Sequence, residues 1–400
     1  MDCRVAVIGA GAAGLCCALK AAGRGGVLLL EGNLRPGRKL SATGSGRCNL
    51  TNLSISPKSY HGDVGIARDF LRDWPAERVT DMFRELGLLT RADSEGRVYP
   101  NSLQAAAVTG ALVSACDEAG VRAEYGFRAG SIVRKKPGFL ITSADGREVS
   151  AKYCVLACGG RASPGHSGGD GYSLARGLGH SVTELSPSLV GLRVKGKLAR
   201  SLKGMRCKAR ASLWRGGREL YGESGEVIFG DGSVSGICVM DLSARMRGLP
   251  GEGLALHLDL MEQLNTCELV SYLASFAASH PERPAGELFS GALNLRVGRE
   301  LVRLLGYGCT LGELGHGQIE RAASLAKDFA LPVAGRLGWE QAQVTAGGVP
   351  LGEVDMPSME SRACPGLYLC GELLDIDGDC GGFNLHWAWA TGLSAGQHLG

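Results

Sequence analysis

Residues 4–14 read Arg4-Val5-Ala6-Val7-Ile8-Gly9-Ala10-Gly11-Ala12-Ala13-Gly14, an apolar run that ends in three spaced glycines. The apolar part has the length and the β-branched residues of a strand, and an apolar segment of helical length, Leu15–Ala22, follows. A second apolar run, Val27–Leu30, ends in Glu31. The stretch therefore predicts a strand, a glycine turn, a helix and a second strand of an α/β fold.

The three glycines match G-x-G-x-x-G, a pattern that binds the pyrophosphate of a dinucleotide. Gly9 allows the tight turn, Gly11 lets the backbone approach the phosphates, and Gly14 lets the helix pack closely on the strand. The helix start at Ala12 and Ala13 supplies N–H groups and the positive end of the helix dipole. We predict a dinucleotide site at this turn.

An acidic residue closes the second strand. Glu31 stands where a carboxylate can accept hydrogen bonds from ribose hydroxyls, which favours FAD or NAD over NADP. The alternative to a dinucleotide site is an ordinary Gly-rich turn, because 62 of the 400 residues are glycine.

The composition is that of a globular protein of two to three domains, with 44% hydrophobic and 21% charged residues. The net charge of +3 is too small to imply a polyanionic partner. We expect a cytoplasmic protein without a membrane partner, because the first strand begins near residue 4 and no apolar run approaches the ~20 residues of a membrane span. The 14 cysteines include no C-x-x-C and indicate reduced thiols.

A segment rich in glycine, cations and small polar residues follows, from residue 32 to 52. Its lack of apolar periodicity predicts a loop. We expect this loop to lie along the cofactor, with Arg38, Lys39 and Arg47 near phosphates; the alternative is a surface linker.

Residues 37–52 contain Gly-Arg-Lys-Leu and then Ala-Thr-Gly-Ser-Gly-Arg-Cys-Asn-Leu-Thr-Asn, a run that resembles the signature of the BaiN-like (aminoacetone oxidase-type) FAD flavoproteins. The resemblance recurs end to end, at residues 96–100, 168–172, 229–236, 345–349 and 371–392. It implies a glutathione-reductase-type FAD-binding fold with a family-specific insert. Cys158 departs from the pattern, because the family more often has Thr there, and so does the segment 161–164, where Lys and an aromatic residue are usual.

Together the fingerprint and the resemblance predict the residues that bind FAD. They are Gly9, Gly11, Ala12, Ala13, Gly14, Glu31, Arg38, Lys39, Gly44, Arg47, Cys48, Asn49, Ala157, Gly159, Gly371, Glu372, Asp379, Gly382, Asn384 and Leu385. The amides of Asn384 and Leu385, at the start of a helix, would stabilise negative charge on the reduced flavin. Arg47, Cys48 and the turn 345–349 are candidates to face the reacting ring, although Cys48 is equally compatible with a packing role.

We predict no metal site. Asp375, Asp377 and Asp379 are spaced like calcium ligands, but the twelfth position of an EF-hand loop counted from Asp375 is His386, not Glu. We interpret His386 as a residue of the helix surface or the pocket. The sequence identifies no catalytic side chain.

The fold we expect is a Rossmann-like FAD-binding domain, a parallel sheet with helices on both faces, formed by residues 1–190 and 337–400. A β-rich, barrel-like insert covers residues 191–255, and a helical insert over the substrate pocket covers residues 256–336. Leu254–Ala278 and Val297–Ala330 are expected to be mainly helical, with Pro281 and Pro284 between them.

A basic stretch begins the insert, with ten cations and no acid between them. They are Arg193, Lys195, Lys197, Arg200, Lys203, Arg206, Lys208, Arg210, Arg215 and Arg218. The alternation from Arg206 to Ala211 predicts a strand with one face in water. The simplest interpretation is a solvated face; the others are the phosphates of a nicotinamide donor, an anionic substrate or nucleic acid.

We predict an FAD-dependent oxidoreductase that passes hydride through flavin N5. BaiN-like members are associated with NADH-driven reduction of a conjugated double bond in 3-oxo bile acids, and others with aminoacetone oxidation by dioxygen. NAD(P)H, as a transient donor, and a small enone substrate are therefore favoured. The alternatives are an amine oxidase that uses dioxygen, an FAD-dependent RNA-modifying or nucleic-acid-binding protein, and a flavin-binding protein without catalysis; a nucleic-acid partner is not expected.

Overall fold

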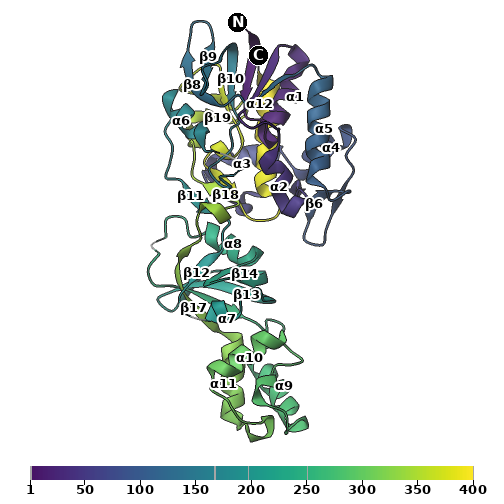
Figure 1. The fold of residues 1–400 in the computed structure, drawn as a ribbon, viewed down its shortest axis with the longest axis vertical. Helices are drawn as coiled ribbons and strands as arrows, with labels where there is room; N and C mark the ends of the chain where they lie inside the picture. Colours follow the sequence, from purple (N-terminus) through teal and green to yellow (C-terminus); the bar gives the residue numbers. More distant parts are fainter. Residues whose placement is uncertain (1, 166–167, 197, 250, 400) are drawn as a thin grey trace. The chain divides into compact units, whose positions relative to one another are not determined.

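The computed structural model describes residues 2–165, 168–196, 198–249 and 251–399. Two compact units divide the chain (Figure 1). Unit 1 comprises Met1–Ser188 and Ala342–Gly400, and unit 2 comprises Leu189–Gln341. The sequence predicts the boundaries between the FAD-binding domain and the insert after residues 190 and 336. No helix within the described ranges is long and apolar enough to span a bilayer.

Five parallel strands form the centre of unit 1. Their order is β7 (Arg122–Tyr125), β2 (Val27–Glu31), β1 (Cys3–Ile8), β10 (Glu148–Leu156) and β21 (Leu367–Leu369). Val5, Val7 and Leu30 are fully buried, as expected for a parallel sheet covered on both faces. The Rossmann-type α/β fold predicted from the opening stretch is confirmed.

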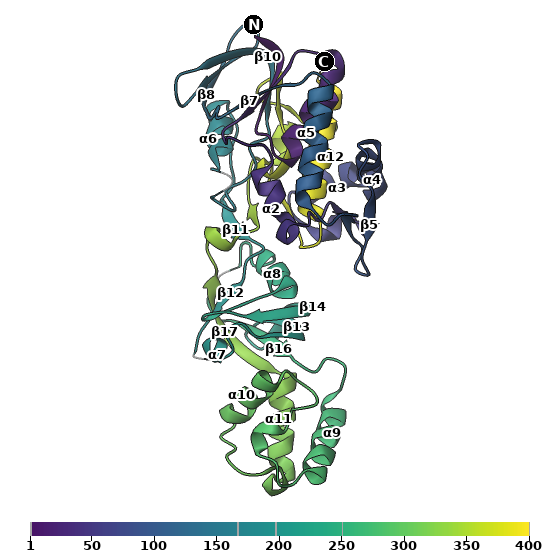
Figure 2. The ribbon, with the colours of Figure 1, turned by 45° about the vertical axis from the view of Figure 1, so that its right-hand side comes forward.

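Three helices pack together beside this sheet, as both ribbon views show (Figures 1 and 2). They are α1 (Ala12–Ala21), α5 (Ala105–Glu118) and α12 (Phe383–His398). Gly392 permits the closest approach, because a Cβ there would lie 2.3 Å from the carbonyl oxygen of Ala13. Helix α12, the last of the chain, therefore packs closely against the first turn of α1.

Antiparallel strands extend the sheet at β10 and at β21. β8 (Ala129–Arg134) and β9 (Phe139–Ser143) form a meander on β10, and β20 (Glu360–Ser361) and β19 (Val354–Asp355) follow β21. A three-stranded sheet contains β3 (Thr51–Asn52), β6 (Arg97–Pro100) and β5 (Thr90–Ala92) in that order. Two smaller sheets pair β4 (Tyr60–Gly62) with β22 (Ile376–Gly378), and β11 (Ser186–Ser188) with β18 (Val344–Ala346). Unit 1 also contains the helices α3 (Val64–Asp73), α4 (Ala76–Glu85) and α6 (Asp170–Gly177).

The segment 32–52 is not only a loop, as the sequence predicted, but contains helix α2 (Arg38–Gly46). The helix buries Leu40 and packs against α5, where Ser41 Oγ lies 3.3 Å from Thr109 Oγ1. Thr43, Gly44 and Ser45 leave helical geometry, so the regular part is short. The burial of Leu40 against the rest of the unit therefore stabilises a helix that the apolar periodicity of the segment does not predict.

Unit 2 contains a closed barrel of six antiparallel strands. Around the barrel they are β12 (Leu192–Val194), β15 (Ser233–Ser235), β14 (Arg218–Phe229), β13 (Arg206–Arg215), β16 (Leu254–Asp259) and β17 (Phe329–Arg336). The predicted alternation on β13 is confirmed, since Ala209 and Ala211 are buried while Arg206 and Lys208 are exposed. Lys197 lies outside the described residues.

Three long helices follow or precede the last barrel strands: α9 (Thr266–Ser279), α10 (Leu295–Leu304) and α11 (His316–Lys327). The short α7 (Leu198–Ser201) and α8 (Ile237–Ala244) belong to the barrel region. The helical prediction is wrong at Leu254–Asp259, which is β16, and from Phe329, where β17 begins. Leu254, Leu256 and Leu258 are buried with a period of two, the period of a strand.

Candidate functional site

The turn after β1 is shaped by three glycines with different surroundings. Gly9 has φ +104°, and a Cβ there would lie 2.5 Å from the carbonyl oxygen of Ala157. A Cβ on Gly14 would lie 1.8 Å from the carbonyl oxygen of Gly9. A Cβ on Gly11 would meet no atom within 4 Å. The outer glycines are therefore required by packing, whereas Gly11 borders open space in which a ligand can approach the backbone.

Helix α1 starts at this open space. Its first bond from an amide within the helix joins Leu15 N to the carbonyl oxygen of Gly11 at 3.0 Å. The amides of Ala12, Ala13 and Gly14 consequently have no acceptor inside the helix. Three amides at the positive end of a ten-residue helix form a site for an anion such as pyrophosphate.

Glu31 ends β2 beside the same turn. Its Oε2 accepts a hydrogen bond from Ala10 N at 2.7 Å, and its Oε1 accepts from Asn33 N at 2.8 Å and Asn33 Nδ2 at 2.6 Å. Arg38 donates to Asn33 Oδ1 at 2.9 Å. The carboxylate thus fixes the turn and is held in place by Asn33, a residue that the sequence analysis did not single out.

The predicted residues Ala157 and Gly159 border the same turn. Ala157 N donates to the carbonyl oxygen of Ile8 at 2.9 Å, so the end of β10 stays beside the end of β1. Gly159 has φ +70°, which allows the chain to turn away from the sheet there.

Glu372 connects segments that are far apart in the sequence. Lys39 Nζ lies 2.5 Å from Glu372 Oε2, and Thr345 N donates to Glu372 Oε1 at 2.9 Å. The hydroxyl of Thr345 accepts from the amides of Arg161 and Ala162 at 2.8 and 3.0 Å. Lys39, expected near phosphates, is therefore neutralised by a carboxylate in this structure.

Gly371 precedes Glu372 in the turn η7 (Gly371–Leu373) and is fixed by α12. Its amide donates to Thr391 Oγ1 at 2.9 Å, and its carbonyl accepts from Trp387 Nε1 at 3.1 Å. A Cβ on Gly371 would lie 3.0 Å from the Cβ of Ala13. The segment that starts at Gly371 is thus brought against helix α1.

The end of α2 carries unusual backbone geometry. Ser45 and Cys48 have φ of +57° and +59°, which costs energy for a residue other than glycine. Cys48 N donates to the carbonyl oxygen of Thr43, and Arg47 lies over the ring of Tyr99 at 5.4 Å. Cys48 is fully buried, and burial raises the pKa of its thiol to about 12, which favours a packing role over that of a nucleophile.

The start of α12 faces Asn49. Gly382 has φ +103°, and a Cβ there would lie 2.7 Å from Asn49 Oδ1, a buried oxygen without a donor among the described residues. The first bond from an amide within the helix is His386 N to the carbonyl oxygen of Gly382 at 2.9 Å. The amides of Asn384 and Leu385 therefore have no acceptor inside the helix. The Asn384 side chain accepts from Gly378 N at 2.8 Å and donates to the carbonyl oxygen of Gly378 at 2.7 Å.

The three aspartates before α12 have separate partners. Thr183 donates to Asp375, Ser188 donates to Asp377, each at 2.8 Å, and His61 Nε2 lies 2.7 Å from Asp379 Oδ1. Within the part of the chain that the structure describes, no group of His, Cys, Asp or Glu is arranged to hold a metal ion.

His386 lies inside α12's packing surface and not on its outer side. It is fully buried, with Nδ1 2.8 Å from Thr51 Oγ1 and Nε2 2.8 Å from the carbonyl oxygen of Trp74. The carbonyl only accepts, so Nε2 carries the proton. Burial lowers the pKa of His386 to about 4, and the neutral ring has a structural role.

These features fit an extended dinucleotide cofactor such as FAD. Free amides at the α1 start suit a pyrophosphate, Glu31 suits a ribose hydroxyl, and free amides at the α12 start suit an electron-rich ring oxygen. At the open space beside Gly11 and at the Asn49 oxygen, the described residues supply no partner.

A model of the family described as HI0933-like protein Rossmann domain matches residues 3–398. The 3-dehydro-bile acid delta(4,6)-reductase of Clostridium scindens is 35% identical over 403 residues, which cover 98% of this chain and 98% of the relative. The ribosomal RNA dihydrouridine synthase of Escherichia coli is 28% identical over 98% of this chain and 97% of the relative.

Solved structures show the same fold at low identity. The 3-ketosteroid-delta4-(5alpha)-dehydrogenase from Rhodococcus jostii RHA1 matches with a TM-score of 0.53 and 15% identity, over 99% of this chain and 96% of that chain. The 3-ketosteroid delta1-dehydrogenase from Sterolibacterium denitrificans matches with a TM-score of 0.53 and 14% identity, over 100% and 99%. Similarity at these identities establishes the fold alone.

Proposed function

Because this chain belongs to the HI0933-like family of FAD-dependent Rossmann-fold oxidoreductases, we propose that it reduces a carbon–carbon double bond conjugated to a carbonyl group, with NAD(P)H as the electron donor. The family predicted from the motifs is confirmed by this match. The observation that carries the proposal is the end-to-end similarity to the bile-acid delta(4,6)-reductase, at 35% identity over 98% of both chains.

The two kinds of relative share one chemical feature. A 3-dehydro bile acid with a delta-4 double bond is an enone, and the uracil ring carries a C5=C6 bond conjugated to C4=O. In the proposed reaction the β-carbon takes a hydride and the α-carbon takes a proton, while NAD(P)H becomes NAD(P)⁺. We favour the steroid-like enone because that relative has the higher identity, and RNA uridine is the second candidate because those relatives also align over nearly the whole chain.

The chain's own residues bind and orient the cofactor in this proposal. The amides of Ala12, Ala13 and Gly14 hold the pyrophosphate, Glu31 accepts from the ribose, and the amides of Asn384 and Leu385 stabilise negative charge at the start of α12. FAD, when bound, supplies the hydride transfer chemistry. The other residues in the proposed FAD site are Gly9, Gly11, Arg38, Lys39, Gly44, Arg47, Cys48, Asn49, Ala157, Gly159, Gly371, Glu372, Asp379 and Gly382.

Anaerobic stopped-flow mixing tests the donor. The FAD-loaded protein is mixed with NADH and, separately, with NADPH while the flavin absorbance is followed. We expect bleaching by one or both. Bleaching by aminoacetone and by neither nucleotide would contradict the reductase and indicate an oxidase.

A second mixing step tests the acceptor. The reduced protein is mixed with a 3-oxo-delta-4 steroid acid, with its saturated analogue as the control, and with uridine-containing RNA. Return of the flavin absorbance with the enone and not with the saturated analogue supports the leading proposal. Return with RNA alone would replace it by the uridine reaction.

A further inference from the structure

The described cations of the basic stretch differ in their surroundings. On the hairpin of β13 and β14, Arg206 pairs with Glu226 at 3.2 Å, and Arg210 pairs with Glu219. The acids come from β14, the antiparallel neighbour, and so follow the basic stretch in sequence. These cations are neutralised within the barrel and offer little charge to a partner.

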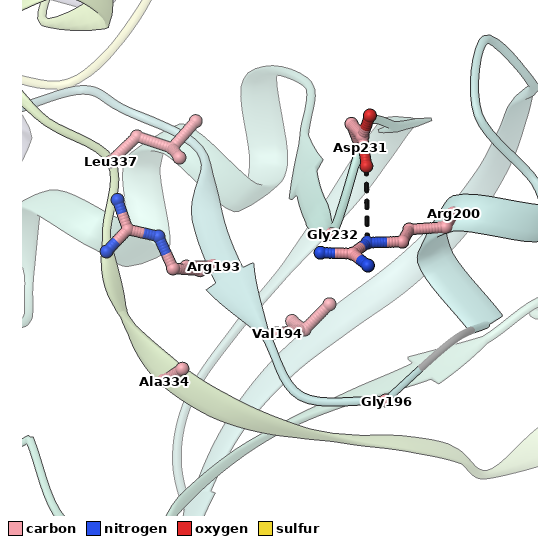
Figure 3. Close-up of a pocket in the computed structure, with 8 residues that line it drawn as sticks. All are labelled: Arg193, Val194, Gly196, Arg200, Asp231, Gly232, Ala334 and Leu337. Atoms are coloured by element: carbon pink, nitrogen blue, oxygen red, sulfur yellow. Dashed lines mark ion pairs between the residues drawn. The ribbon is translucent and has the colours of Figure 1, made fainter.

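Two earlier cations of the stretch line a cavity of unit 2 instead (Figure 3). The cavity measures about 450 Å³, which is in the size range of small-molecule sites. Its lining residues are Arg193, Val194, Gly196, Arg200, Asp231, Gly232, Ala334 and Leu337. They come from β12, α7, the turn between β14 and β15, and the segment that contains β17.

The walls of the cavity are fixed by the backbone. Val194 N donates to the carbonyl oxygen of Gly232 at 3.0 Å, and Lys195 N donates to the carbonyl oxygen of Pro332 at 2.8 Å. These bonds hold the end of β12 between the β14–β15 turn and β17. Gly196 and Gly232 carry no side chain that would narrow the space.

The two arginines that line the cavity differ in their partners. Asp231 is shared by Arg200 and Lys203, each at 3.2 Å. The side chain of Arg193 has no hydrogen-bond or ion-pair partner among the described residues, and Arg193 is exposed. In Figure 3 its guanidinium extends toward Leu337 and away from the pair of Arg200 with Asp231. The cavity therefore has an excess of positive charge and one guanidinium that is available to a ligand.

We propose that this cavity binds a phosphate group of a nucleotide-sized ligand, with Arg193 as the anchor. A guanidinium offers two parallel donors that match a phosphate, and the apolar side chains of Val194 and Leu337 can contact the body of a nucleoside. The shared chemistry has two sources, the 2′-phosphate of NADPH and the phosphodiester of RNA. The proposal uses no step of the reductase reaction.

Calorimetric titration of the full chain, saturated with FAD so that the α1 site is filled, tests the binding. The probes are adenosine 2′,5′-bisphosphate, a short oligouridylate, and adenosine as the uncharged control. We expect one phosphate probe to bind and adenosine not to bind. Binding of the bisphosphate assigns the site to a nicotinamide donor, and binding of the oligouridylate assigns it to RNA. Failure of both phosphate probes to bind would overturn the proposal.

Three variants locate the site. Arg193→Gln should weaken binding by about tenfold, because a charge-assisted bond is lost. Arg218→Gln is the matched control: Arg218 belongs to the same stretch and is exposed, but lies at the opposite end of β14 from Asp231. Asp231→Asn should strengthen binding, because Arg200 and Lys203 lose their shared acid. Equal losses in the two arginine variants, or weaker binding in Asp231→Asn, would overturn the proposal, and a failed reductase assay would not affect this readout.

Discussion

Lys39 Nζ lies 2.5 Å from Glu372 Oε2, an ion pair between two residues that are 333 positions apart. Both side chains are mostly buried, with 25% and 17% of their surfaces exposed. Since Thr345 N binds the other oxygen of the carboxylate, one side chain holds α2, η7 and β18 together. The pair therefore organises the edge of the proposed cofactor site.

Glu372→Gln removes the charge and retains an oxygen that can accept from Thr345 N. We expect FAD binding to weaken by about 1.5–3 kcal/mol, because Lys39 loses its partner in a partly buried place. Flavin fluorescence titration measures the change. Lys39→Met and the double variant complete the cycle, and additive effects of the two changes would contradict coupling through this pair.

Gly11 and Gly14 should respond differently to alanine. Gly14→Ala places a Cβ 1.8 Å from the Gly9 carbonyl oxygen, so we expect a loss of about 2 kcal/mol or more in the free energy of unfolding. Gly11→Ala meets no protein atom and should cost about 1 kcal/mol or less. Its FAD occupancy should nevertheless fall, because the methyl group occupies the approach to the α1 amides. Thermal unfolding and flavin content after purification distinguish the two, and full occupancy in Gly11→Ala would place the pyrophosphate elsewhere.

Glu31 has two roles that two substitutions can separate. Glu31→Ala leaves Ala10 N and Asn33 N without their acceptor and should lower both stability and FAD retention, the former by about 1–3 kcal/mol. Glu31→Gln retains one carbonyl acceptor and removes the charge, so its stability should change less than its FAD affinity. The comparison requires unfolding curves without FAD and a flavin titration. Unchanged FAD affinity in both variants would exclude Glu31 from ribose binding.

The fold of the opening stretch could be predicted because its determinants are local. The turn, the phosphate approach and the helix packing each depend on one glycine at a fixed spacing, and Gly9 and Gly14 have the tight surroundings expected of them. The partner of Lys39 could not be predicted, because it lies at the other end of the chain. Sequence periodicity contains no information on contacts of that kind.

The errors in unit 2 have the same origin. Leu254 and Leu258 are four positions apart, a spacing shared by helices and strands, and only the barrel neighbours of β16 decide between them. The basic stretch contains no acid within itself, yet Glu219 and Glu226 face it across an antiparallel ladder. The strand that carries these acids comes after the stretch in the sequence. Its pairing with β13 therefore determines which cations remain available to a ligand.

The stability of unit 1 should fall in weak acid through His386. Its pKa of about 4 in the folded protein lies below the usual value of 6.5, so the unfolded chain binds this proton first as the pH falls. The neutral ring contributes about 3 kcal/mol to the free energy of unfolding. This contribution is complete above pH 6.5 and is lost as the pH falls from about 6.5 to 4. Denaturant unfolding at pH 7 and pH 4.5 measures it through the fluorescence of the buried Trp387 and Trp389.

His386→Gln should reduce the difference in stability between these two pH values, because glutamine does not titrate. His316→Gln is the matched control, since it makes the same substitution at a histidine that is 72% exposed, on α11 of unit 2. Carboxylates that titrate in the same range affect all three proteins alike, so only the difference between variants reports on His386. An equal pH dependence in the wild type and His386→Gln would show that His386 titrates normally in the folded state.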